Sequence, residues 1–295
     1  MVYKSDLSNQ STVSDGTGGA CSEHYDRSAT TRLRTQHESE TRGHSLSEVI
    51  SAQILPRLLI LHHERESAVG APVVEPNEIC EFGALAMGAD AVGASSYFDE
   101  MRGRGHSLDT LFLHLLAPTA RYLGKLWEED RCDFVDVTLG VARLQEILAF
   151  FSDPHDYRST DVQHRAVLIA PLGEKHFFGL DMVGRFMARS GWDVSLEKGV
   201  SPKQSAELVS QEWVGVVGMA LSSESGLEAL ARMIKHLRSA SLNVRIGVMV
   251  GGPLFNDHPE LAIQVGADAA ASDAPTAVLL AKRLLLRQAA RQEVA

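Results

Sequence analysis

The sequence predicts an α/β protein in which an N-terminal helical bundle precedes a doubly wound, parallel, five-stranded sheet. Two observations lead to this prediction. Between residues 44 and 155, apolar side chains recur three and four residues apart, which is the spacing of amphipathic helices. Over residues 160–292 the pattern changes to short apolar runs that alternate with amphipathic stretches, as in parallel strands joined by helices.

The amino-acid composition argues against several classes of protein. The chain has 295 residues, with 28 Lys and Arg against 38 Asp and Glu, and a formal net charge of -10. This acidic balance disfavours a protein that binds nucleic acid directly. Three scattered cysteines indicate free thiols rather than a disulfide framework. The N-terminus lacks a signal pattern and the apolar runs are too short to span a bilayer, so we expect a cytoplasmic protein without membrane contact.

The N-terminal half divides into two parts. Residues 1–43 are rich in Ser, Thr, Gly and charged residues, which predicts a disordered tail. Residues 44–155 are expected to form a four-helix bundle. Its helices are predicted over 46–61 after a Ser45 or Ser47 cap, over 75–97, from Ser107 onwards, and from Asp133 or Asp136 to residue 151.

The C-terminal part, residues 160–292, alternates strands and helices. The first run, 166–170, is continuous and apolar, as expected for a strand buried on both faces. Further strands are predicted at 192–196, 214–218, 245–250 and 267–271, and helices at 177–190, after 201–202, at 224–239, at 259–265 and from 274. In such a sheet, ligands bind beyond the carboxyl ends of the strands, at the topological switch point. The loops at 171–179, 219–224 and 251–256 are therefore the candidate binding loops.

The first of these loops contains the pattern E-x-H-x-x-G, formed by Glu174, His176 and Gly179. A histidine in this position can offer one ring nitrogen to a metal while a carboxylate accepts the proton of the other. Gly179 removes a side chain where a bulky group would pass close to the backbone. The alternative interpretation is an exposed loop histidine beside a carboxylate at a helix terminus.

Three segments together resemble the cobalamin-binding fold: the loop 171–179, the pair Gly251-Gly252 after the fourth strand, and the stretch 266–269. The resemblance implies that His176 is the lower cobalt ligand and that Glu174 orients it. It also implies that Gly179, Gly251 and Gly252 make room for the nucleotide tail of the cofactor. The family places a four-helix bundle before the sheet domain as a cap, so the resemblance covers about residues 75–290.

Two further stretches narrow the resemblance. The segment 123–127, followed by Asp130, is similar to the cap signature of corrinoid proteins, which implies that Trp127 lies over the upper face of the corrin. Photoreceptors of the CarH type and methyl carriers commonly continue with a Glu-His pair, whereas this chain reads Phe-Val-Asp-Val-Thr-Leu-Gly over 134–140. That departure resembles the PpaA/AerR group of photosynthesis-gene regulators. The Lys-His-x-x-Gly loop of that group matches Lys175 and His176 here.

The loop after the third strand departs from the cobalamin-binding pattern. Ala220 stands where many members have a serine that contacts the benzimidazole, and Leu221 and Ser222 follow it. Ser222 or Ser223 is a candidate to replace that serine. The alternative is that these serines cap the helix that begins near Glu224.

The sequence leaves three candidate functions. The resemblance implies a light-responsive, non-enzymatic regulator that binds adenosylcobalamin or hydroxocobalamin and acts as an antirepressor on a repressor of the CrtJ/PpsR type. The second hypothesis is a corrinoid methyl-carrier subunit of a methyltransferase, which positions the cofactor for a separate catalytic subunit. The third is a haem sensor with His176 as the axial ligand.

Overall fold

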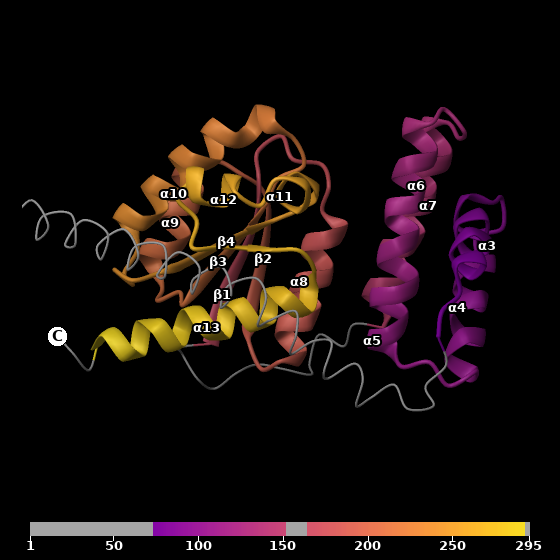
Figure 1. The fold of residues 1–295 in the computed structure, drawn as a ribbon, viewed down its shortest axis with the longest axis horizontal. Coiled ribbons are helices and arrows are strands. Elements are labelled where there is room, and N and C mark those ends of the chain that lie inside the picture. Colours follow the sequence, from indigo (N-terminus) through magenta and orange to yellow (C-terminus); the bar gives the residue numbers. More distant parts are fainter. Residues whose placement is uncertain (1–72, 152–163, 293–295) are drawn as a thin grey trace, which may run out of the picture. The chain divides into compact units, whose positions relative to one another are not determined.

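The computed structural model describes residues 73–151 and 164–292 of the chain. The predicted tail over 1–43 and the predicted helix over 46–61 lie outside these residues. The described chain forms a helical part and a sheet part (Figure 1). Within the described residues, no helix is long and apolar enough to cross a membrane.

The helical part contains four helices between residues 76 and 150. The first two are α3 (Pro76–Met87) and α4 (Gly93–Gly103). The third is continuous and consists of α5 (Leu108–Leu111), a π-helical turn (Phe112–Leu116) and α6 (Ala117–Glu128). The fourth is α7 (Phe134–Phe150). The predicted single helix over 75–97 is wrong. The chain is extended at Gly88, and the carboxylate of Asp90 accepts the N–H of Val92, which starts a new turn instead.

Side-chain caps fix the starts of two helices where the sequence predicts them. Ser107 accepts the N–H of Thr110 at 3.1 Å and so caps the third helix. Asp133, rather than Asp136, caps α7, while Asp136 returns the bond to the N–H of Asp133 as a capping box. Aromatic rings fill the centre of this part. The rings of Phe98 and Phe112 are stacked, with their centroids 5.9 Å apart.

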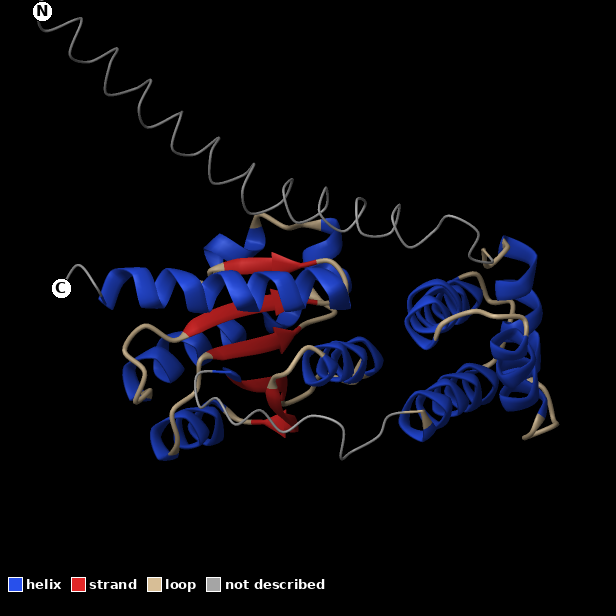
Figure 2. Cartoon of the chain, turned by 90° about the horizontal axis from the view of Figure 1, so that it is seen from below, coloured by secondary structure: helices blue, strands red, loops and turns tan. Residues whose placement is uncertain are grey.

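The sheet part is a five-stranded, all-parallel sheet in the order β2-β1-β3-β4-β5. Figure 2 draws its strands as red arrows. The predicted α/β fold class is therefore confirmed. The strands are β1 (Arg165–Pro171), β2 (Asp193–Val200), β3 (Val216–Ala220), β4 (Gly247–Gly251) and β5 (Ala269–Ala271). The third and fourth strands end later than the sequence predicts, and β2 extends to Val200. The loops that follow these strands therefore begin later in the sequence than predicted.

Helices cover both faces of this sheet. α9 (Pro202–Gln211) and α10 (Leu227–Ala240) pack on one face, and α8 (Phe178–Arg189) and α13 (Ala274–Gln292) pack on the other (Figure 1). Short helices α11 (Pro253–Asp257) and α12 (Leu261–Gln264) link β4 to β5, and a 3-10 turn (Glu224–Gly226) precedes α10. The sequence did not predict α11, which Pro253 begins at its first position. Because β1 lies between β2 and β3, the switch point falls between the carboxyl ends of β1 and β3.

Candidate functional site

The loop after β1 begins with a tight turn that presents Glu174. The N–H of Glu174 donates to the carbonyl of Pro171 at 3.0 Å, and Gly173 within the turn has φ +94°. That backbone conformation favours glycine, so Gly173 is required for the turn. The N–H of Leu172 donates to the carbonyl of Val200 and ties the loop to β2. Glu174 is thereby held over the end of the sheet.

The carboxylate of Glu174 is buried and surrounded by hydrogen-bond donors. Its side chain is 2% exposed. It accepts the backbone N–H groups of Lys175 at 2.8 Å, His176 at 2.7 Å and Ser222 at 2.7 Å. It also accepts the Ser222 hydroxyl at 2.9 Å and Nδ1 of the His176 ring at 2.9 Å. Burial raises the pKa of this carboxyl, but the bonds from His176 and Ser222 outweigh it and hold the pKa below its ordinary value.

This arrangement fixes the tautomer of His176. An ionised carboxylate only accepts hydrogen bonds, so the proton of the imidazole lies on Nδ1, which faces Glu174. Nε2 then carries the free lone pair that a metal requires. The His176 side chain is 71% exposed, so Nε2 is accessible from outside the loop. The two residues that the sequence pairs are thus in contact, and the arrangement suits an axial ligand.

Ser222 contacts Glu174, and its predicted contact with a benzimidazole stays a prediction. Its hydroxyl and its N–H both donate to Glu174, and it does not cap the helix after β3. The hydroxyl of Ser223 bonds to Ser225 instead. Ser222 reaches Glu174 because the carboxyl ends of β1 and β3 meet at the switch point. That adjacency is the signal that could have paired Ser222 with Glu174 from the sequence.

The three predicted glycines have three different surroundings. A Cβ on Gly179, in the first turn of α8, would meet no atom within 4 Å, so the space that the prediction requires is present there. A Cβ on Gly251 would lie 3.1 Å from the carbonyl oxygen of Ala271. Gly252 has φ +100°, and its Cβ would lie 2.6 Å from the carbonyl oxygen of Leu221. Glycine is thus required at 252 by the backbone itself, and its predicted role beside the nucleotide tail stays a prediction.

The remaining predicted residues lie around or away from this cluster. Ala220 is the last residue of β3, paired in register with Gly251, and Leu221 is buried in the core on the α10 face. The side chain of Lys175 is exposed, and only its N–H contacts Glu174. Trp127 is on α6 in the helical part, 46% exposed, with its ring edge-on to Phe134. Its place over a corrin stays a prediction.

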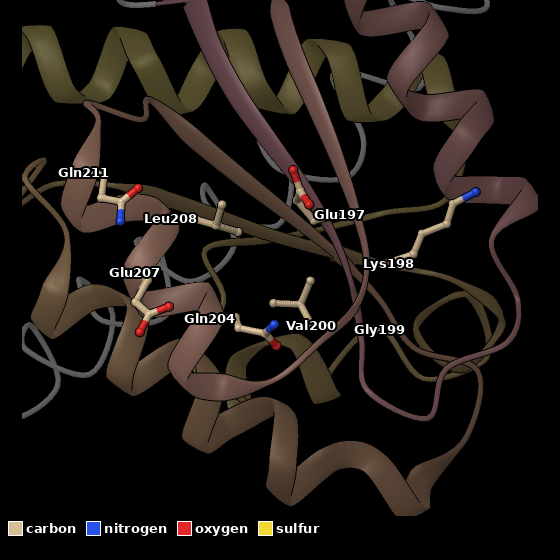
Figure 3. Close-up of a pocket in the computed structure, with 8 residues that line it drawn as sticks. All are labelled: Glu197, Lys198, Gly199, Val200, Gln204, Glu207, Leu208 and Gln211. Carbon is tan, nitrogen blue, oxygen red and sulfur yellow. The ribbon is translucent and has the colours of Figure 1, made fainter.

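A hollow of about 260 Å³ lies between the end of β2 and α9, as Figure 3 shows. Glu197, Gln204 and Glu207 line it. Lys198, its one cationic lining residue, extends away from Gln204 and Glu207 (Figure 3) and pairs with Asp181 at 2.9 Å. The carboxylates that remain do not suit the phosphate group of a nucleotide tail, so this hollow is not part of the candidate site.

The bond from Ser222 to Glu174 makes stability sensitive to pH. The folded pKa of Glu174 lies below its ordinary value, so the ionised carboxylate stabilises the fold above about pH 4.3, and this contribution is lost as the pH falls through the folded pKa. Ser222→Ala should cost about 1.5–3 kcal/mol at neutral pH and shift the acid loss to higher pH. Thermal unfolding between pH 3 and 7 measures both. Ser223→Ala, a change to the next hydroxyl, should match the wild type, and equal curves for all three proteins would contradict the assignment.

Comparison with known proteins gives the class to which this site belongs. Residues 164–279 match the B12 binding domain family. This match supports the predicted resemblance to the B12-binding superfamily over these residues. The chain is 27% identical over 178 residues to an uncharacterized 20.5 kDa protein of the bchF-crtJ intergenic region of Rhodobacter capsulatus, which covers 60% of this chain and 92% of that protein.

A solved structure supports the fold. The monomethylamine corrinoid protein of Methanosarcina barkeri superposes with a TM-score of 0.60 at 16% sequence identity. The match covers 71% of this chain and 100% of that one. At this level of identity the likeness concerns the fold, which includes a parallel sheet of the kind described above.

Proposed function

We propose that the protein binds cobalamin with His176 as the lower cobalt ligand, and that it serves as a light-responsive, non-enzymatic antirepressor. The observation that carries the proposal is the exposed imidazole whose Nδ1 is held by a buried carboxylate. Such a contact fixes the ring and raises its basicity as a ligand.

The scarcity of metal-ligating side chains among the described residues favours a metal that is already bound in a macrocyclic cofactor. Among the described residues, no group of three or more His, Cys, Asp or Glu side chains could hold a metal ion. A metal bound through His176 would therefore take its other ligands from the cofactor, as in a corrin or a porphyrin. The B12-binding domain over 164–279 favours the corrin.

The residues present fit cobalamin at this place. His176 would coordinate through Nε2, Glu174 and Ser222 would hold its ring, and the open space beside Gly179 would admit a bulky group. The cofactor supplies a cobalt–carbon bond that light breaks when the upper ligand is an alkyl group. The chain's own contribution is to fix the lower ligand and keep its Nδ1 proton on the Glu174 side.

The regulatory role is supported by a relative. The similar protein of Rhodobacter capsulatus is named for the bchF-crtJ intergenic region, which agrees with the resemblance to the PpaA/AerR group. We therefore propose a repressor of the CrtJ/PpsR type as the partner. The net charge of -10 favours an output through a protein rather than through direct contact with DNA.

The test is to reconstitute the protein with adenosylcobalamin and measure repressor–DNA binding in the dark and after illumination. Antirepression should differ between the two states and be absent when the His176→Ala variant replaces the wild type. A bound cofactor with no effect on the repressor in either state would contradict the antirepressor role. Methyl transfer to or from the reduced cofactor would instead indicate a methyl carrier, and a Soret band in the purified protein would indicate haem.

A further inference from the structure

One face of α7 in the helical part is largely apolar and yet exposed. It consists of residues three or four positions apart, which we call the α7 stripe: Val135, Leu139, Ala142, Glu146 and Phe150. The helical period places residues with this spacing on one side of a helix. Val135 is 67%, Leu139 39% and Phe150 81% exposed, and Glu146 is the one charged residue of the stripe. A continuous exposed apolar stripe is typical of a surface that another protein covers.

A groove of about 350 Å³ between α4 and α7 adjoins the stripe. Glu146 and Phe150 line the groove together with Ala94 and Ile147. The Phe150 ring contacts the ring of Phe151 edge-on, with their centroids 4.9 Å apart. Because α7 has 17 residues, the stripe is about 25 Å long. The stripe and the groove together have the form of a surface that receives one helix.

The stripe is distinct from Trp127, the residue expected over the corrin. The ring of Trp127 contacts the ring of Phe134 edge-on, with their centroids 6.0 Å apart. Successive residues of an α-helix are about 100° apart, so Phe134 lies roughly a quarter turn from Val135 and outside the stripe. A corrin against Trp127 would therefore not account for the exposed apolar residues of the stripe.

The charge of the helical part indicates the kind of partner. Residues 73–151 contain 13 Asp and Glu but six Lys and Arg, a formal net charge of -7. No residue of the described ranges forms an ion pair with Glu146. The guanidinium of Arg143 instead donates to the carbonyl oxygen of Ala86 at 2.7 Å. Like charges that face each other across an interface are unfavourable, so this surface favours a positively charged partner over a second copy of the same acidic surface.

We propose that the α7 stripe and the groove bind one amphipathic helix of a partner protein. Apolar side chains of that helix would pack against Leu139 and Phe150, and a Lys or Arg would lie beside Glu146. The identity of the partner rests on the proposed function, which makes it the repressor. A DNA-binding repressor carries Lys and Arg on the elements that contact phosphates, so it has a helix of this chemistry. Binding to the stripe would withdraw that helix from DNA, which gives antirepression a physical basis.

A designed peptide tests the surface without the repressor. The probe is a fluorescently labelled peptide as long as α7, with Leu at helical spacing and Lys at the other positions. One comparison peptide has Glu in place of Lys, and the other has the composition of the probe in scrambled order. Fluorescence anisotropy should show that the full-length protein binds the probe at least about tenfold more tightly than either comparison peptide. Equal affinity for the three peptides would overturn the proposal.

Matched variants locate the binding on the stripe. Leu139→Ser and Phe150→Ser should each weaken probe binding about tenfold, because each removes an apolar contact. Ile263→Ser is the control, since Ile263 is 82% exposed on α12 in the sheet part. Glu146→Lys should weaken binding of the probe more than Glu128→Lys, which makes the same change of charge on α6 outside the groove. Stripe variants that bind like the wild type would overturn the proposal. A dimer of the protein alone that Phe150→Ser dissociates would assign the stripe to a second copy and would also overturn it.

The repressor assay separates this inference from the proposed function. We expect the wild type to relieve repression and Phe150→Ser to fail, while the cobalamin affinity of the variant stays unchanged. Antirepression that persists in Phe150→Ser would overturn this inference alone. Probe binding at the stripe of a protein that has no antirepressor activity would contradict the proposed function and support the docking surface.

Discussion

Replacing His176 with alanine is expected to lower the affinity for cobalamin by at least about 100-fold and to change the absorption spectrum of any cofactor that remains. Loss of a residue that only supports a metal ligand typically costs 10–100-fold, and His176 is the proposed ligand itself. Equilibrium binding of hydroxocobalamin, followed by its visible spectrum, measures both effects. Free imidazole should restore the spectrum of the ligated cofactor, because it can occupy the position of the missing ring.

The sheet part offers a matched control for this change. His258 is also an exposed histidine whose Nδ1 lies near a carboxylate, that of Glu260, at 3.4 Å. It lies in the connection between α11 and α12, outside the Glu174 cluster. His258→Ala should therefore leave affinity and spectrum unchanged. An unchanged spectrum in His176→Ala itself would remove the lower-ligand assignment.

Replacing Gly252 with alanine should strongly destabilise the chain even without cofactor. At φ +100° and ψ 174° the backbone is in a region that is nearly exclusive to glycine, and the new Cβ would lie 2.6 Å from the Leu221 carbonyl oxygen. Strain and overpacking together should cost roughly 2–6 kcal/mol of unfolding free energy. Thermal unfolding of the cofactor-free protein measures this, with an expected fall in melting temperature of about 10 °C.

Gly179→Leu should show the opposite profile. A Cβ at Gly179 meets no atom within 4 Å, and leucine favours the helix by up to about 0.8 kcal/mol over glycine. The cofactor-free protein should therefore be as stable as the wild type, while cobalamin affinity falls because the open space is filled. If both variants lost stability equally, the distinction drawn between these two glycines would be wrong.

The sequence predicted the sheet well because its signals are local. Continuous apolar runs such as 166–170 mark buried strands, and caps such as Ser107 and Asp133 mark helix starts. The errors arose where tertiary context decides. The break at Gly88 is not distinguishable by periodicity from a continuous helix, and α11 is too short to leave a periodic pattern.

The candidate site was only partly predictable for the same reason. Glu174 and His176 are two residues apart, so a short motif contains their contact. Ser222 lies 48 residues from Glu174, and its contact depends on the strand order β1-β3. The backbone requirement at Gly252 likewise depends on the approach of Leu221 from another strand end. Neither contact leaves a signal in the local sequence.

The carboxylate of Glu174 also joins the loops after β1 and β3. It accepts N–H groups from Lys175 and His176 on one loop and from Ser222 on the other, so neither loop can shift without exposing a buried charge. The loops after β1 and β3 are therefore joined through one buried carboxylate, and the second loop leads through the 3-10 turn into α10.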